Sequence, residues 1–244
     1  MRLSRRKAWW IALSAAAVLA AALWWRTSSP LAQPDRRIGL FTSLPILWNE
    51  AAALDELVDT KDEPHWARAV LEDRGTVVPL DTLLRVANID MLVIAQPRPL
   101  TPEENVALDA WLRGGGKLLL FADPMLTEDS AFSLGDRRRP QDVVLISPIL
   151  ARWGLVLRFD DEQPLGERES AGERLPVNLQ GEFTLAGGGH DAACAIGPNG
   201  LIARCRVGKG RAVLVADAAL LEREADSDSR ISALRRLLDE AASD

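Results

Sequence analysis

"MLVIAQPRPLTPEENVALDAWLRGGGKLLLFADP" (Met91–Pro124) contains a strand, a helix and a second strand in that order. The apolar runs Met91–Ala95 and Lys117–Ala122 are typical of parallel strands that are covered on both faces. Between them, Thr101 suits a helix N-cap and Pro102 suits the first helical position. Two strands joined by a helix form a βαβ unit, so the sequence predicts an α/β fold with a parallel sheet flanked by helices.

The glycines at Gly114–Gly116, next to Lys117, look at first like a phosphate-binding loop. Such a loop follows a strand and opens a helix, so that backbone N–H groups face the anion. Here the glycines follow a helix and precede a strand, which is the reverse order. We therefore expect Gly114 to end the helix in the left-handed C′ position, and we expect no nucleotide there.

The same signals extend the fold outward. Ile38–Phe41 predicts a buried strand, and a helix around Trp66 is expected to end at a left-handed Gly75. Thr76–Leu80 predicts a strand at an edge or strand end, because Pro79 has no N–H to donate. "SPILARWG" (Ser147–Gly154) predicts a short helix capped by its serine, and Leu155–Phe159 a strand after it.

The C-terminal part changes its period. Residues 192–217 alternate apolar runs with the turns "GPNG" and "GKG", which predicts a β-meander. Residues 229–242 predict a closing amphipathic helix. Residues 125–142 are polar and are expected to form a long surface loop, while residues 160–190 have too weak a pattern to assign.

Cys194 and Cys205 are the two cysteines of the chain, and a disulfide between them depends on the turn that joins their strands. A two-residue turn at Asn199–Gly200 places 194 directly opposite 205. A type I turn at Pro198–Asn199 with a left-handed Gly200 shifts the register by one and separates them. The sequence leaves both registers open.

The N-terminal segment is unlike the rest. Ala8–Trp25 is uncharged over 18 residues, tryptophans stand at both of its ends, and a basic cluster precedes it. These features predict a single membrane-spanning anchor with a cytoplasmic N-terminus. A cleaved signal peptide and a buried soluble helix are the alternatives. The expected domains are therefore residues 1–26 as basic stub and anchor, 27–37 as linker, and 38–244 as an exported domain.

Charge and motifs restrict the function. Residues 1–37 contain seven arginines and lysines and one acidic residue, Asp35, which gives a net charge of +6. Because the whole chain has a net charge of −6, residues 38–244 carry a net charge of −12. An acidic body argues against nucleic-acid binding. With two histidines we expect no metal site, no cofactor and, because the common hydrolase motifs are missing, no catalytic set. Asp160–Glu162 fits a solvated turn or, as an alternative, a cation site; Arg137–Arg139 fits a solvated loop or a contact for an acidic partner.

The order of three stretches resembles a known family. "NIDMLVIAQPRPLTPEENVALDAWLRGGGKLLLFADP", "SPILARWGLVLRFDD" and "RVGKGRAVLVADAALL" are similar to the periplasmic domain of auxiliary components of ABC-type transport systems linked to gliding motility, and to related bacterial families of unknown function. The resemblance covers residues 38–220. It implies a flavodoxin-like fold, akin to class I glutamine amidotransferases. Amidotransferases place a cysteine nucleophile after such a strand, whereas this chain has Ala122-Asp123-Pro124.

The anchor, the order of these motifs and the missing catalytic set together predict a non-catalytic accessory or ligand-binding component of an ABC transport system. It is expected to be anchored in the bacterial inner membrane, with permease or ATPase subunits as its partners. A ligand is expected at the carboxyl ends of the strands. The sequence residues expected there are Thr42, Ser43, Gln96 and Asp123. The alternatives are a degenerate or unrecognised hydrolase on the same fold, which would use Asp123 or neighbouring carboxylates, and a structural envelope scaffold.

Overall fold

The computed structural model describes residues 36–48, 50, 64–223 and 228–243. All of them belong to one compact unit, Arg36–Asp244. The predicted anchor at residues 8–25 lies outside the described residues and stays a prediction. Among the helices that are described, none combines the length and apolar character needed to span a membrane.

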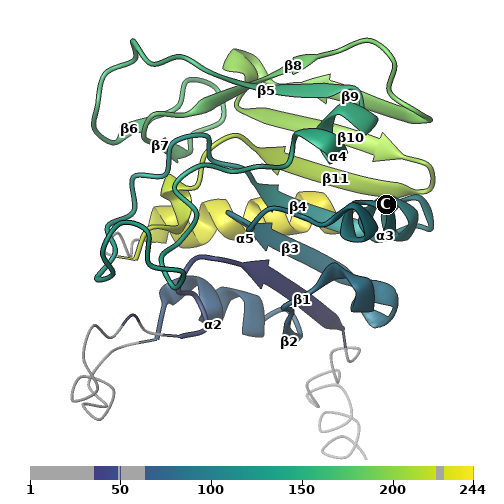
Figure 1. Cartoon of the computed structure of the whole chain (residues 1–244), viewed down its shortest axis with the longest axis horizontal. Coiled ribbons are helices and arrows are strands. Elements are labelled where there is room, and N and C mark those ends of the chain that lie inside the picture. Colours follow the sequence, from purple (N-terminus) through teal and green to yellow (C-terminus); the bar gives the residue numbers. More distant parts are fainter. Residues whose placement is uncertain (1–35, 49, 51–63, 224–227, 244) are drawn as a thin grey trace, which may run out of the picture. The chain divides into compact units, whose positions relative to one another are not determined.

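A seven-stranded sheet forms the centre of the domain (Figure 1), in the order β2-β1-β3-β4-β11-β10-β9. Its strands are β1 (Arg37–Thr42), β2 (Thr76–Pro79), β3 (Met91–Ala95), β4 (Lys117–Phe121), β9 (Ala192–Ile196), β10 (Ile202–Val207) and β11 (Gly210–Val215). The strands from β2 to β11 pair in parallel, while β10 and β9 add antiparallel pairs. The predicted parallel sheet and β-meander are confirmed, and the meander continues the same sheet. The parallel part has the 2-1-3-4-5 order of flavodoxin-like sheets.

Helices cover both faces of the sheet (Figure 1). One face packs α2 (Trp66–Glu72) and α5 (Asp228–Ala242) in a core with residues such as Leu40 and Val93. The other face packs α3 (Pro102–Arg113), α4 (Ser147–Arg152) and the 3₁₀ segment η2 (Leu83–Asn88) in a core with residues such as Leu92. Because both faces are covered, every residue of β3 is buried, which explains its uninterrupted apolar sequence.

Helix α3 begins and ends close to the prediction. Thr101 accepts from the Glu104 N–H, and the Glu104 side chain accepts from the Thr101 N–H, so the two form a capping box. At the other end the predicted left-handed position is wrong by one residue. Gly114 is still helical, with φ of −69°, and Gly115 takes the positive φ of 117°. The glycines therefore end a helix and do not form a phosphate loop.

Two other helix ends differ from the prediction. Helix α2 ends at Asp73 in helical geometry, and Gly75 does not adopt a left-handed conformation. Gly75 is needed for space instead, because a Cβ there would lie 2.2 Å from the Arg36 carbonyl oxygen. Ser147 is inside α4 and does not cap it; Ile146 is the N-cap residue and supplies no side-chain hydrogen bond.

The segment that the sequence left unassigned forms two small antiparallel sheets. β5 (Leu155–Phe159) pairs with β8 (Gly181–Leu185), and β6 (Arg168–Glu169) pairs with β7 (Pro176–Val177). Two further 3₁₀ turns, η3 (Pro198–Gly200) and η4 (Ala219–Leu221), complete the described elements.

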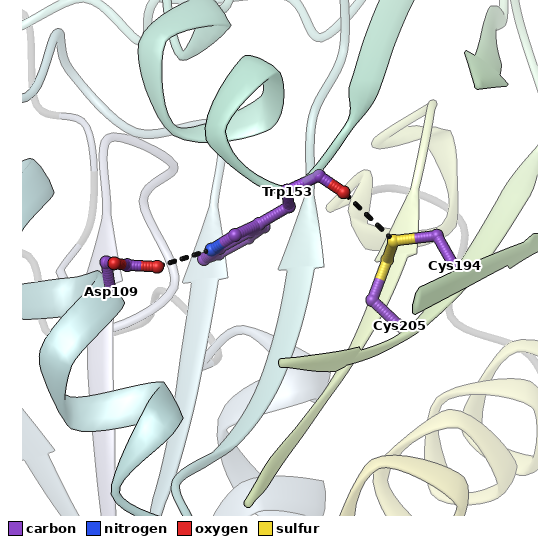
Figure 2. The surroundings of a disulfide bond; sticks show 4 residues. All are labelled: Asp109, Trp153, Cys194 and Cys205. Atoms are coloured by element: carbon purple, nitrogen blue, oxygen red, sulfur yellow. Dashed lines mark hydrogen bonds between the residues drawn. A yellow bond between two sulfur atoms is a disulfide. The ribbon is translucent and has the colours of Figure 1, made fainter. Parts of the chain in front are cut away.

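A disulfide joins Cys194 of β9 to Cys205 of β10, which lie directly opposite each other in the sheet (Figure 2). The register is the one predicted from a two-residue turn, but the loop itself is longer. The Gly197 N–H donates to the Ile202 carbonyl oxygen, and the Gly200 N–H donates to the Gly197 carbonyl oxygen across a turn centred on Pro198 and Asn199, where Asn199 and Gly200 have positive φ of 56° and 67°. The carbonyl oxygen of Trp153 lies 3.6 Å from Cys194 Sγ. Because a disulfide sulfur has no hydrogen to donate, this is a packing contact.

Candidate functional site

The four residues expected at the carboxyl ends of the strands lie there, but they divide into two groups. Thr42 is the last residue of β1, Ser43 follows it, and both line a cavity. Gln96 and Asp123 follow β3 and β4 and are fully buried. Sequence position alone could not separate the two groups.

Gln96 links the loops that leave neighbouring strands. Its carboxamide nitrogen donates to the carbonyl oxygens of Asp123, at 3.0 Å, and Gln141, at 2.7 Å. Its oxygen accepts from the Asp123 N–H at 3.0 Å. Its backbone is left-handed, with φ of 44°, and its carbonyl accepts from the Ser43 hydroxyl. All of these side-chain hydrogen bonds are made to backbone groups of the protein itself.

Asp123 has a partner that the sequence analysis missed, Asp217. Asp123 accepts from the N–H groups of Met125 and Ala218, and Asp217 accepts from those of Asn178 and Ala219. The two aspartates follow β4 and β11, which pair in parallel with Phe121 opposite Val215. The repeated Ala-Asp after each buried strand was the sequence signal, since paired parallel strands bring equivalent positions together.

Both carboxyl groups are buried, and this controls their ionisation. Burial raises the pKa of Asp123 to about 6, against the lowering effect of the two backbone N–H groups. Burial and then the charge of Asp123 raise the pKa of Asp217 well above its usual range. Neither residue is among those that line four cavities formed by the described residues, of about 390, 550, 350 and 390 Å³.

A pH prediction follows for Asp123. Because its folded-state pKa is raised, its protonation stabilises the fold below about pH 4, and that stability is lost as the pH rises through about 6. The loss is on the order of 3 kcal/mol, from about 1.4 kcal/mol for each pKa unit. Asp123→Asn gives up a backbone hydrogen bond at every pH, so its deficit against the wild type should be greatest at pH 4 and shrink towards pH 7.

Urea unfolding at several pH values measures this difference. Exposed Asp161 provides the control, and Asp161→Asn should follow the wild-type curve throughout. Parallel curves for the wild type and Asp123→Asn would contradict the prediction. Comparing variants is necessary because His65 opposes the trend: burial lowers its pKa to about 4, so its contribution to stability falls as the pH drops from about 6.5.

The cavity at this end of the sheet has a volume of about 390 Å³. It is lined by the last two residues of β1, by residues that follow β1, β2 and β3, and by the loop after β4. The lining residues are Phe41, Thr42, Ser43, Trp48, Leu80, Asp81, Arg98, Arg137, Arg138, Arg139 and Gln141. We call it the arginine cavity. It lies at the carboxyl ends of β1 and β3, which are neighbours in the sheet. The chain leaves them to opposite sides, from β1 to β2 and from β3 to β4, and such a point is the ligand-binding position in open parallel sheets.

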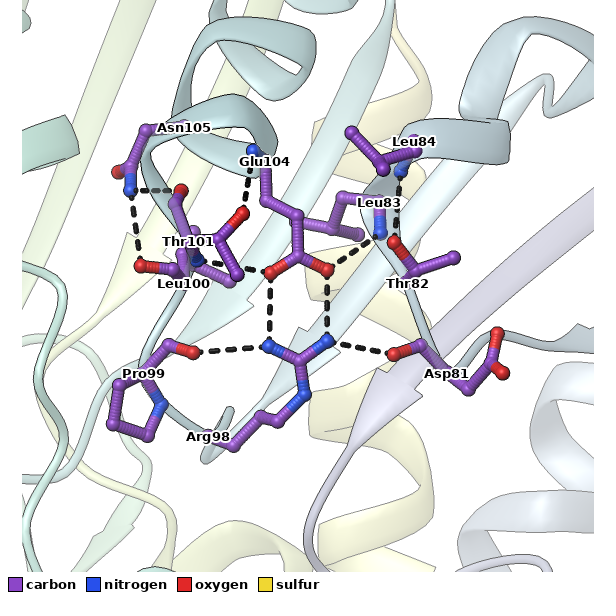
Figure 3. Close-up of polar contacts among 10 residues, drawn as sticks. All are labelled: Asp81, Thr82, Leu83, Leu84, Arg98, Pro99, Leu100, Thr101, Glu104 and Asn105. Carbon is purple, nitrogen blue, oxygen red and sulfur yellow. Dashed lines mark hydrogen bonds and ion pairs between the residues drawn. The ribbon is translucent and has the colours of Figure 1, made fainter.

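Arg98 forms one wall and is held in place by Glu104 (Figure 3). Its two terminal nitrogens donate to the two Glu104 carboxylate oxygens at 2.8 and 2.7 Å. They also donate to the carbonyl oxygens of Pro99 and Asp81, and the guanidinium lies 5.0 Å from the Phe41 ring centre. The hydrogen bond from Arg98, ahead of the opposing effect of burial, lowers the pKa of Glu104 to about 2.

A second cavity, of about 350 Å³, lies beside this one and is acidic. Glu50, Glu128, Asp129 and Glu222 line it with Arg223 and two further residues. Burial raises the pKa of Glu128 to about 7 and also raises that of Glu222. Across the described residues, no group of three or more histidine, cysteine, aspartate or glutamate side chains is arranged to hold a metal ion.

Comparison with known proteins gives one family. The family model described as "ABC-type uncharacterized transport system" matches residues 36–163, just over half of the 244 residues. The matched segment runs from the start of β1 past β5, and it includes every residue that lines the arginine cavity. No curated protein matches the sequence.

Solved structures share the fold only loosely. A β-galactosidase from Rahnella sp. R3 matches with 13% identity and a TM-score of 0.46, over 84% of this chain and 30% of its own. An exo-β-1,4-mannosidase from Opitutaceae bacterium strain TAV5 matches with 15% identity and a TM-score of 0.45, over 91% and 37%. A cytoplasmic protein from Salmonella typhimurium LT2 matches with 10% identity and a TM-score of 0.45, over 84% and 98%. The chain thus spans about a third of the two glycosidases, and likeness at this level says nothing of activity.

Proposed function

This chain belongs to the family described as "ABC-type uncharacterized transport system", and from that premise we propose that it is an exported, non-catalytic auxiliary component that binds a ligand for its transporter. Its N-terminal segment, residues 8–25, serves as the membrane anchor in this proposal. Permease or ATPase subunits of the same system are its partners.

The family match is the observation that carries the proposal. It covers the half of the sheet that contains β1 and β3, and therefore the carboxyl ends at which open parallel sheets receive ligands. Export is supported by the disulfide between Cys194 and Cys205, because disulfides persist in oxidising compartments and are rare in the cytosol.

A hydrolase that uses Asp123 is the alternative, and the raised pKa of Asp123 favours it, since shifted pKa values gather at active sites. Two observations favour the non-catalytic function instead. The Asp123 side chain has no exposed surface, and each of its carboxylate oxygens already accepts a backbone N–H. A general base must come within hydrogen-bonding distance of its substrate, which this packing prevents.

Site-specific photo-crosslinking in the native membrane tests the proposal. Leu134 and Leu165 are each 82% exposed and lie in different loops, so either can be replaced by a photoreactive amino acid without disturbing the core. We expect at least one position to give an adduct with an ABC permease or ATPase subunit in the full-length chain. Samples kept in the dark provide the control.

Two outcomes would overturn the assignment. One is that neither position, nor chemical crosslinking followed by pull-down, recovers a subunit of an ABC system. The other is a hydrolytic activity of the purified chain that Asp123→Asn abolishes while leaving the fold intact.

A further inference from the structure

The arginine cavity has more hydrogen-bond donors than the protein uses. Arg137 makes no hydrogen bond or ion pair with any described residue, so all of its guanidinium donors are available. Arg138 contacts Asp136 through Nε and Nη2, and Arg139 contacts Asp142 and the Phe132 carbonyl oxygen through Nε and Nη1. One terminal nitrogen of each of these two arginines therefore remains.

The carboxylates that pair with these arginines stand on the solvent side. The side chains of Asp136 and Asp142 are 28% and 51% exposed, and ion pairs in such positions contribute little. Asp81 is the acidic residue of the lining. The hydrogen bond to Glu104 is the main cause that raises the pKa of Arg98, and the charge of Asp81 adds to it. With Arg138 and Arg139 each paired with one aspartate, residues 136–142 keep one net positive charge at the cavity, that of Arg137.

Apolar and aromatic residues also line the cavity. The Trp48 side chain is 44% exposed, and Leu80 lies with it in the lining. Thr42 Oγ1 accepts from the Leu44 N–H, which leaves its hydroxyl hydrogen to donate. Ser43 cannot assist, because its hydroxyl already donates to the Gln96 carbonyl and accepts from Gln141.

The net charge of residues 136–142 is opposite in sign to that of the domain around them. Residues 38–244 have a net charge of −12, so the four arginines around this cavity do not belong to a generally basic surface. Guanidinium groups match phosphate and carboxylate oxygens in geometry, and exposed tryptophan offers a flat face to a ring.

We propose that the arginine cavity binds a small molecule in which a phosphate or carboxylate group is joined to a flat apolar ring. The anion meets Arg137, with Arg138, Arg139 and the Thr42 hydroxyl beside it, and the ring lies against Trp48. This inference rests on the proposed ligand-binding function and names the chemical class of the ligand.

Calorimetric titration of the full-length chain with phenyl phosphate tests the inference. Benzyl alcohol supplies the ring without charge, and inorganic phosphate supplies the charge without a ring. We expect saturable binding of phenyl phosphate that weakens with added salt. Arg137→Ala should weaken it by about tenfold or more, since a charge-assisted hydrogen bond is lost. Trp48→Ala should weaken phenyl phosphate and leave inorganic phosphate unchanged.

Arg85, which is exposed and does not line the cavity, provides the matched control, and Arg85→Ala should bind as the wild type does. The inference is overturned if phenyl phosphate does not saturate, if benzyl alcohol binds equally well, or if Arg85→Ala and Arg137→Ala have the same effect. Crosslinks to ABC subunits without probe binding would overturn the proposed ligand site and support the proposed transport function. Probe binding without such crosslinks would support the proposed ligand site and overturn the proposed transport function.

Discussion

Replacing Glu104 with alanine is expected to lower the free energy of unfolding by about 3 kcal/mol, of which the lost helix cap accounts for about 1 kcal/mol and the buried N–H left without an acceptor for about 2 kcal/mol. The Glu104 side chain is only 2% exposed. It accepts from Arg98 twice, from the Thr101 N–H at 3.0 Å and from the Leu83 N–H at 3.2 Å. The variant loses the capping box and leaves a buried N–H without its acceptor. Urea unfolding followed by circular dichroism measures the loss.

Glu103 is the matched control because it occupies the same first turn of α3 and is exposed. Glu103→Ala should cost only a few tenths of a kcal/mol, from the weaker interaction with the helix dipole. Glu104→Gln, which keeps an acceptor oxygen, should fall between the two alanine variants. Equal losses for Glu103→Ala and Glu104→Ala would show that the pair adds no stability. Since the Glu104 pKa is lowered to about 2, the stabilisation should also disappear as the pH falls from about 4.5 through 2.

Trp153→Ala should cost about 3–5 kcal/mol, the range for removing a large aromatic side chain from a core. Trp153 is 1% exposed, and its indole N–H donates to Asp109 at 3.0 Å, as Figure 2 shows. Asp109 also accepts from Arg113 and Arg152, so it joins α3 to the end of α4. The tryptophan connects that network to the disulfide-bonded strands.

Two variants separate packing from hydrogen bonding at Trp153. Trp153→Phe keeps most of the apolar contact and loses the N–H, so it should cost about 1–2 kcal/mol, near the penalty of an unpaired buried acceptor. Trp48→Ala removes a tryptophan that is 44% exposed and should cost less than about 1 kcal/mol. Thermal and urea unfolding of the three variants measure the order of their losses in the free energy of unfolding. A Trp153→Ala loss as small as that of Trp48→Ala would contradict the assigned burial.

Much of the fold was predictable because its signals are local. The apolar run Met91–Ala95 and the cap at Thr101 require only nearby residues to be interpreted, and both are confirmed. The errors at Gly75 and Ser147 have a different source. Gly75 is required by the backbone of Arg36, which is distant in sequence, and Ser147 continues a helix that Ile146 had already begun.

The site was predictable only to the level of the sheet edge. Alternation places Gln96 and Asp123 after their strands, but it does not tell whether a side chain there points to solvent or holds two loops together. Arg137–Arg139 was interpreted chiefly as a solvated loop, since nothing local shows that residues 137–139 approach Thr42, which lies almost 100 residues earlier. Contacts of that kind depend on tertiary structure.

The position of β11 has a consequence for how the chain folds. β11 lies between β4 and β10, although among the described strands it comes last in the sequence. Until residues 210–215 arrive, β4 has an unpaired edge formed by "KLLLF", which can pair with other chains and aggregate. Closing a parallel pair over such a long intervening loop is also slow. Residues 36–163 should therefore not be used alone as a binding fragment, and the nascent chain needs protection until residues 210–215 have emerged.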